Sequence, residues 1–145
     1  MVNSLVLIKT CCLGGTMNDQ RCGFGSIWWV DDAVWARELP EFRWRKKPGD
    51  SRHPGVSIKR VSQVGPQLSP VTMLFGTSQY QGPLVFLGLS AKNPTAPTYF
   101  GRIASPATIS HDDRQQRLVN PNHAKKELEP TEKKDLHCWC TQKGL

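Results

Sequence analysis

The chain has 145 residues, of which 38% are hydrophobic, and its 19 Lys and Arg against 12 Asp and Glu give a net charge of +7. This length predicts one domain, five Trp argue against wholesale disorder, and the 11 Pro and 12 Gly argue against a long helical bundle. No apolar run approaches the roughly 20 residues of a membrane-spanning helix, and the basic excess indicates an anionic partner, most commonly a nucleic acid.

Residues 1–16 look separate from the domain that follows them. We expect either that they form a poorly ordered N-terminal extension or that Met17 is the natural start of the protein. Their apolar run, Leu5–Ile8, is too short for an export signal, so a cytoplasmic location is expected. The odd number of cysteines favours free thiols over disulfides. The alternative is a metal site built from Cys22, His137, Cys138 and Cys140. Our expectation, however, is that the protein binds neither a metal nor another cofactor.

Short β-forming segments separated by Gly, Pro and Asp turns succeed one another along residues 17–145, which we expect to form a single domain. A long basic connection, 33–51, separates the first strand from the second. Pro130 and the acidic residues around it predict the start of a helix over about 130–142. The expected fold is therefore mainly β, a small and strongly bent antiparallel sheet or barrel with a C-terminal helix. The predicted strands are 26–30, 54–61, 71–75, 84–87, 99–103 and 107–110.

Most of the positive charge lies in residues 37–60, which carry eight Lys and Arg against three Asp and Glu, or +5. Aromatic and cationic side chains alternate within this segment, as in proteins that bind single-stranded nucleic acid by stacking bases and pairing phosphates. The alternative is a solvated loop whose two aromatic residues merely anchor it to the domain. The residues concerned are Phe42, Arg43, Trp44, Arg45, Lys46 and Lys47.

Two polar groups at strand ends are the candidates for catalysis. Ser51-Arg52-His53-Pro54 opens the second strand and Gly76-Thr77-Ser78-Gln79 closes the third, so antiparallel pairing could bring them together. A guanidinium, an imidazole and two hydroxyls can cleave RNA without a metal, because they supply a base and stabilise the charged phosphorane. A purely structural role for His53 is the alternative, and for the pairs Asp31-Asp32 and Asp112-Asp113 we expect only turn formation.

Several of these segments resemble the MazF/PemK family of toxin ribonucleases. Gly25-Ser26-Ile27-Trp28-Trp29-Val30-Asp31 matches that family's opening strand except at Ser26, and Ser51–Ile58 is similar to its next strand start. Phe75–Gln79 and Leu128–Leu136 are similar to the end of its third strand and to its late helix. The chain differs in having His53 beside the proline, where the family has an arginine; Arg52 stands one place earlier.

This resemblance implies an SH3-like barrel of the MazF/PemK/CcdB type, a homodimer that binds RNA across its interface, and an antitoxin that occupies the same groove. It implies a toxin that cleaves single-stranded messenger RNA without a metal. Thr77 would contact the scissile phosphate, and Arg52 or His53 would act as the catalytic cation or acid; Ser78 is a further candidate catalytic residue. Asp31, Gln79 and the 42–47 segment would border the RNA. The alternative is a non-catalytic barrel that binds nucleic acid or a protein through residues 37–60.

Overall fold

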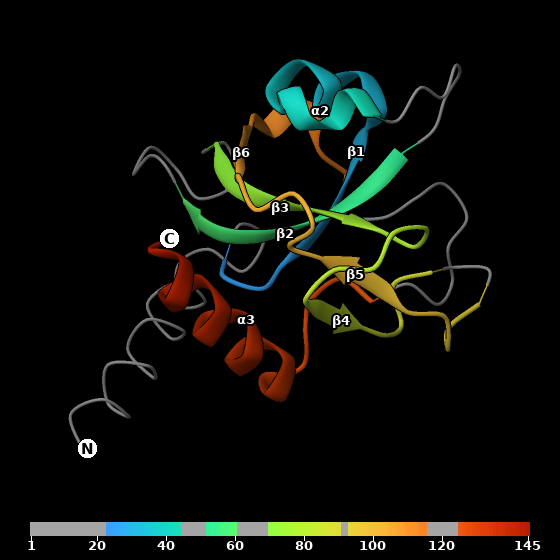
Figure 1. Cartoon of the computed structure of the whole chain (residues 1–145), viewed down its shortest axis with the longest axis vertical. Helices are drawn as coiled ribbons and strands as arrows, with labels where there is room; N and C mark the ends of the chain where they lie inside the picture. Colours follow the sequence, from blue (N-terminus) through green and yellow to red (C-terminus); the bar gives the residue numbers. More distant parts are fainter. Residues whose placement is uncertain (1–22, 45–51, 61–69, 91–92, 116–124) are drawn as a thin grey trace.

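The computed structural model describes residues 23–44, 52–60, 70–90, 93–115 and 125–145 (Figure 1). The predicted extension 1–16 and the proposed start at Met17 lie outside these ranges. Within them, no helix combines the length and the apolar character that crossing a bilayer requires.

The part of the chain that the structure describes forms six strands, and each predicted strand is found with at least one end shifted by one or more residues. The fifth strand stops at Phe100 instead of continuing to Ile103, because Gly101 adopts a φ of +91° and turns the chain. The elements are β1 (Ile27–Asp31), α2 (Asp32–Glu38), η1 (Pro40–Trp44), β2 (Arg52–Arg60), β3 (Val71–Thr77), β4 (Leu84–Phe86), β5 (Thr98–Phe100), β6 (Ala107–Ile109), η2 (His111–Asp113) and α3 (Pro130–Lys143).

The strands make one antiparallel sheet in the order β1-β2-β3-β5-β4, and β3 also pairs with β6. The first half of β3, Val71–Met73, pairs with β6, whereas its end, Gly76–Thr77, pairs with β5. Over the described residues the sheet does not close into a barrel, so the expectation of a closed barrel is corrected. After η2 the chain meets the first strand and the residue before it through isolated bridges, Trp29 with Gln115 and Ser26 with Glu127, and not through a paired strand of the described residues.

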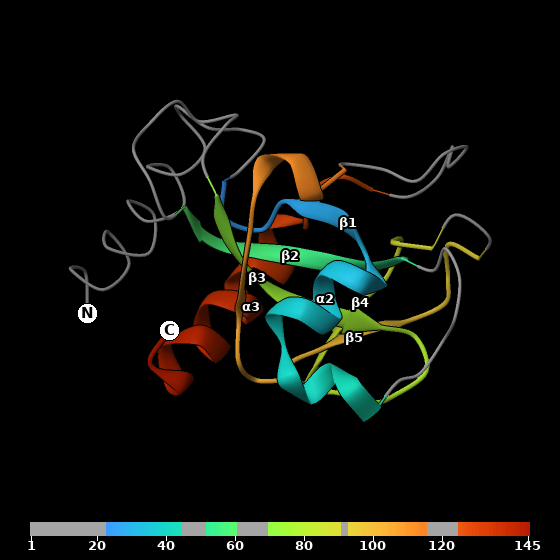
Figure 2. The same cartoon turned by 90° about the horizontal axis from the view of Figure 1, so that it is seen from above.

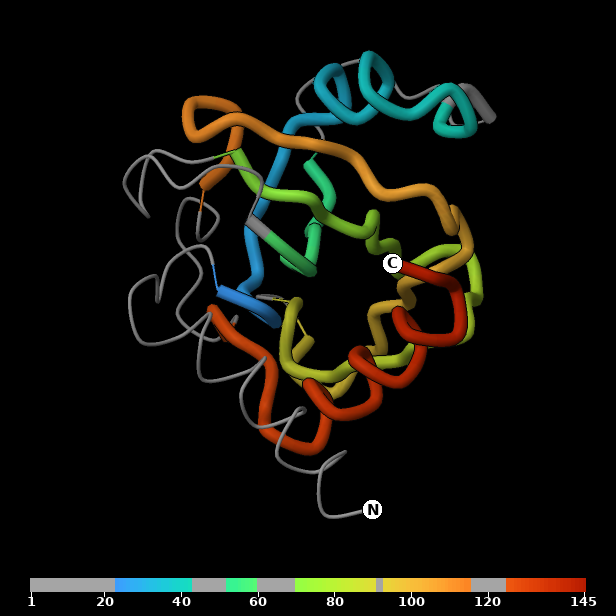
Figure 3. The backbone as a smooth tube through the Cα atoms, turned by 90° about the vertical axis from the view of Figure 1, so that its left-hand side faces the viewer, coloured from blue at the N-terminus to red at the C-terminus, as the bar shows by residue number. Residues whose placement is uncertain are grey.

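Two apolar layers lie on opposite faces of the sheet, as the side-chain alternation of a β-strand requires. On one face, Val30, Met73 and Phe75 pack with residues of α2 and η1. On the other face, Val56, Leu74 and Phe100 pack with Leu136 and with other residues of α3. Figures 1 and 3 show α2 and α3 on opposite sides of the strands.

The predicted connection 33–51 contains a helix that the sequence analysis did not anticipate. Asp31 is the N-cap of α2. Val34 and Trp35 of α2, its C-cap Leu39 and Phe42 of η1 are buried against the sheet. Gly55 makes the close approach possible: a Cβ there would lie 2.5 Å from Met73 Cε and 2.9 Å from the Trp35 ring. Tertiary packing rather than helix propensity therefore stabilises this seven-residue helix.

The helix predicted over 130–142 is confirmed and spans Pro130–Lys143. A capping box joins Glu129 and Glu132, Pro130 occupies the first turn, and Gly144 ends the helix with a φ of +73°. Leu136, Trp139 and Cys140 face the sheet. This helix therefore covers the face of the sheet opposite to α2.

Candidate functional site

The register of the sheet places the two strand ends of the predicted site at the same end of the sheet. β1 and β2 pair Val30 with His53 and Asp31 with Arg52. β2 and β3 pair Gly55 with Phe75, and this register brings the start of β2 level with the end of β3. The candidate site therefore lies where β1 ends, β2 begins and α2 starts (Figure 2).

His53 and Asp32 form an enclosed pair at the centre of this site. His53 Nδ1 lies 2.5 Å from Asp32 Oδ1, and the two side chains retain only 11% and 9% of their exposure. The indole Nε1 of Trp35 donates a 3.2 Å hydrogen bond to the His53 carbonyl and fixes the backbone. An ionised carboxylate only accepts hydrogen bonds, so a neutral imidazole beside an ionised Asp32 carries its proton on Nδ1. Nε2 is then the basic nitrogen, as in enzymes whose histidine is oriented by an aspartate.

Aromatic side chains surround the His53 ring. Its centroid lies 5.0 Å from that of Phe75 and 6.0 Å from that of Phe42, and these two rings contact each other edge to face. Phe42 is only 3% exposed, so its predicted role in stacking an RNA base is wrong, and the alternative of an inward anchor holds for it. It is buried because η1 places it over Phe75. The side chains of Arg43 and Trp44, and all of Arg45, Lys46 and Lys47, lie outside the described residues.

Arg52 belongs to a different polar group from His53. Its Nε donates to Asp31 Oδ1 at 2.8 Å and its Nη1 donates to Gln115 Oε1 at 2.9 Å. Neighbouring residues in a strand point to opposite faces, so Arg52 and His53 leave β2 on different sides. The expected gathering of guanidinium and imidazole in one cluster is therefore corrected. Asp31, predicted to border the RNA, is exposed but paired with Arg52.

The residues at the end of β3 are only partly available to a ligand. Thr77 is 1% exposed, and its Oγ1 accepts the backbone N–H of Gln79 at 3.1 Å. In this arrangement Thr77 caps the turn after β3 and does not reach the solvent as a phosphate contact would require. Within the described part of the chain, no hydrogen bond joins Thr77 to Arg52 or His53. Ser78 and Gln79 are exposed at the same end of the sheet.

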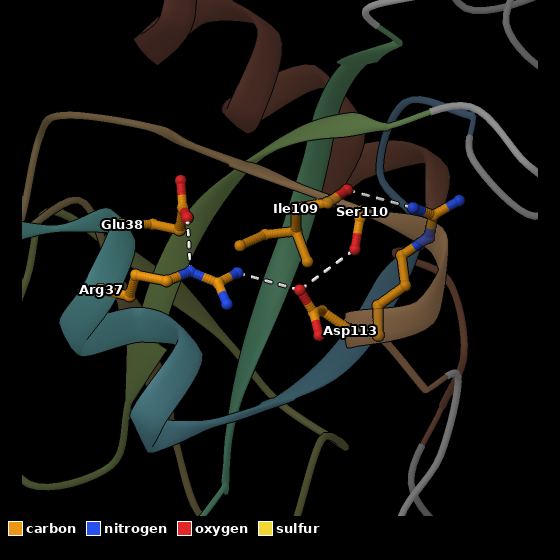
Figure 4. A network of polar contacts seen from close by, with 6 residues as sticks. Arg37, Glu38, Ile109, Ser110 and Asp113 are labelled. Carbon is orange, nitrogen blue, oxygen red and sulfur yellow. Dashed lines mark hydrogen bonds and ion pairs between the residues drawn. The ribbon is translucent and has the colours of Figure 1, made fainter.

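A second polar network fastens α2 to η2 (Figure 4). Arg37 donates to Glu38 at 2.8 Å and to Asp113 at 2.9 Å, and Ser110 donates to the same Asp113 carboxylate at 3.1 Å. The hydrogen bond from Arg37 lowers the pKa of Asp113, and the bonds to Glu38 and Asp113 raise the pKa of Arg37. Asp113 therefore does more than form a turn.

We expect Asp113→Asn to destabilise the protein slightly at pH 7, by about 0.2–1 kcal/mol, because the ion pair is largely exposed. The Asp113 pKa is lower in the folded than in the unfolded protein, so the stabilisation is complete above the ordinary value of 3.8 and disappears as the pH falls through the folded value. Urea titrations at pH 7 and pH 2.5 measure the difference. A gap between wild type and variant that persists at pH 2.5 would contradict this assignment.

The cysteines that the structure describes are both free thiols. Cys138 is exposed, whereas Cys140 is buried, and burial raises the pKa of its thiol to about 11. Cys22, the remaining cysteine of the alternative metal site, lies outside the described residues. Across the described ranges, no three His, Cys, Asp or Glu side chains are grouped so as to hold a metal ion.

Sequence reasoning missed Asp32, Trp35 and Gln115 as members of the site. Asp32 was assigned to a turn, because its position two residues after Val30, the partner of His53, matters only once β1 and β2 are aligned. Trp35 falls in the segment predicted as a connection. Gln115 lies just after η2, and nothing in the sequence links it to Arg52.

Comparison with known protein families, with curated proteins and with solved structures finds no match to this chain.

Proposed function

We propose that the chain is an endoribonuclease that cleaves single-stranded RNA without a metal. The observation that carries this proposal is the enclosed His53–Asp32 pair, in which a carboxylate 2.5 Å from Nδ1 orients the imidazole as a base. The net charge of +7 supports an RNA substrate, because long-range attraction raises the local concentration of a polyanion.

The proposed reaction uses the 2′-hydroxyl that lies next to each phosphate of RNA. His53 Nε2 removes the proton of a 2′-hydroxyl, and the 2′-oxygen forms a bond to the adjacent phosphorus. The bond from phosphorus to the 5′-oxygen breaks and that oxygen takes a proton from water; the hydroxide left behind is neutralised by the proton that His53 then gives up. The products are a 2′,3′-cyclic phosphate and a 5′-hydroxyl. The exposed hydroxyl of Ser78 is the group we assign to the phosphate charge, since Arg52 leaves β2 on the other side from His53.

The biological setting of the proposal comes from the resemblance of the strand and helix segments to the MazF/PemK ribonucleases. On that basis we propose a cytoplasmic toxin that cleaves messenger RNA, is neutralised by a cognate antitoxin and works as a homodimer. We also propose that its sheet is a variant of the SH3-like barrel. The antiparallel strand order and the covering C-terminal helix support this part of the proposal.

The direct test is cleavage of a long unstructured RNA in excess EDTA. We expect fragments that end in a 2′,3′-cyclic phosphate and no cleavage of DNA of the same sequence, because the attacking group is the 2′-hydroxyl. A single 2′-deoxy substitution at a mapped cleavage position should block that position only. RNA that stays intact, or cleavage that EDTA abolishes, would contradict the proposal.

A non-catalytic binding module is the second candidate, and two observations favour it. Thr77 is buried, and Arg52 is bonded to Asp31 and Gln115. Such a module binds RNA in a salt-dependent manner, because phosphate contacts release counterions, but it does not cleave the bound strand. The EDTA experiment separates the two candidates, since only the nuclease generates cyclic phosphate ends.

A further inference from the structure

The face of the sheet that carries His53 is covered over only part of its width. α2 and η1 cover it above β1, β2 and β3, where Val30, Met73 and Phe75 are buried. Beyond β3 the same face continues over β5 and β4, with no described helix above it. There Tyr99 is half-buried, Val85 is 49% exposed, and Leu87, just after β4, is 50% exposed.

Extended by two residues beyond its last pair, Gly55 with Phe75, the β2–β3 register puts His53 level with Thr77 and so with Tyr99. Tyr99 pairs with Thr77 on one side and with Val85 on the other. The residues that flank them in sequence, Leu84, Phe86 and Phe100, belong to the opposite layer, so Tyr99 and Val85 point to the His53 face. The strands β2 and β5 are separated by β3 alone, which is two strand spacings or roughly 10 Å.

A second aromatic residue and a cation lie at the end of β5. The guanidinium of Arg102 sits 5.3 Å from the ring centroid of Tyr80, which is 36% exposed. The connection that carries Tyr80 lies close to β5, since a Cβ on Gly82 would be 2.7 Å from the Phe100 carbonyl oxygen and 3.1 Å from the Arg102 nitrogen. Exposed rings accompanied by a cation are the groups with which proteins hold single-stranded nucleic acid.

We propose that Tyr99 is a base-stacking subsite for single-stranded RNA, and that it holds a nucleotide next to the one whose 2′-hydroxyl meets His53. This inference rests on the proposed function. The RNA strand would run from the His53–Asp32 pair to Tyr99 on the same face of the sheet, with the apolar side chain of Val85 next to the stacked base and Arg102 near the phosphates.

RNA fits this surface better than a protein partner does. Tyr99 lies one strand beyond β3 from the candidate catalytic pair, and the chain carries an excess of seven positive charges, which attracts a polyanion. Tyr99 supplies a π-face, which stacks on any base and costs little conformational entropy to hold.

The test compares Tyr99→Thr with Tyr99→Phe. Thr keeps the β propensity but removes the ring, whereas Phe keeps the ring. The probe is a 2′-O-methyl oligonucleotide, which has no free 2′-hydroxyl to attack the phosphate, so binding is measured without cleavage. With fluorescence anisotropy at fixed salt, we expect Tyr99→Thr to weaken binding roughly 5- to 150-fold and Tyr99→Phe to stay within about twofold of wild type. A 2-aminopurine base in the probe should lose fluorescence on the wild type and the Phe variant only, which a structural role would not produce.

The outcomes separate this inference from the proposed function. If wild type cleaves RNA and all three proteins bind the probe equally, the stacking subsite is wrong and the nuclease stands. If binding depends on Tyr99 but no protein cleaves, the subsite stands and the nuclease proposal falls. If Tyr99→Thr and Val85→Lys instead change the mass measured by sedimentation and leave probe binding unchanged, the face joins two copies of the chain and the inference is overturned.

Discussion

Replacing His53 by alanine is expected to reduce RNA cleavage by about 10²- to 10⁴-fold, the range that a positioned general base contributes. The expected loss is in kcat, because His53 acts on the 2′-hydroxyl in the transition state and little of it is exposed to bind substrate. Single-turnover cleavage of a labelled RNA in EDTA, with variant and wild type purified in parallel, measures the effect.

Asp32→Asn tests how His53 is held. The amide can turn its NH₂ group toward Nδ1, and this stabilises the tautomer whose Nε2 carries the proton and cannot act as a base. In serine proteases the corresponding change lowers kcat by about 10⁴-fold without disturbing the geometry. We therefore expect a loss on the order of 10²-fold or more, with the affinity for a non-cleavable probe unchanged.

His111 supplies a matched control. It also lies beside an aspartate, with its Nδ1 3.2 Å from Asp112 Oδ1, but both side chains are exposed on η2. His111→Ala should cleave RNA at the wild-type rate. Equal losses in the His53 and His111 variants would point to a general effect on folding or charge, and full activity in His53→Ala would refute the assigned base.

Trp35→Ala is expected to lower the free energy of unfolding by about 3–5 kcal/mol, a large part of the roughly 5–15 kcal/mol that stabilises a domain. Trp35 is fully buried, its ring packs edge to face on Phe75 at 5.1 Å, and it fills the space above Gly55. Without the indole, α2 loses its main contact with the sheet. Urea denaturation followed by circular dichroism measures the change.

Trp35→Phe separates packing from hydrogen bonding at the same position. Phe keeps an aromatic ring next to Phe75 and loses the indole bond to the His53 carbonyl, which costs about 1 kcal/mol, in addition to a smaller packing loss. The free energy of unfolding of the Phe variant should therefore lie well between those of the wild type and the Ala variant. If the Ala variant were as stable as wild type, α2 would not be anchored by Trp35.

The sequence predicted the strands because alternating apolar residues and turn residues are local signals, and it predicted α3 because Pro130 and the acidic residues mark its start. It did not predict α2, since a seven-residue helix owes its stability to Trp35 and Phe42 packing on distant strands. The separation of Arg52 from His53 results from strand alternation and could have been predicted. The pairing of His53 with Asp32 depends on how β1 and β2 align, which no local pattern determines. The sequence also could not show that the sheet stays open, because closure into a barrel depends on the course of the chain after η2.

The division of β3 between two partners on one edge has a consequence for folding kinetics. β2 joins β3 through a short intervening segment, but β6 reaches Val71–Met73 from more than 30 residues further along the chain, and β5 reaches Gly76–Thr77 from more than 20. Such distant pairings form only after a large loop has closed. Because loop closure costs chain entropy before any stabilising contact is made, these pairings slow folding. The β2–β3 hairpin is therefore the natural nucleus, and β5 and β6 add to opposite halves of a strand that is already in place.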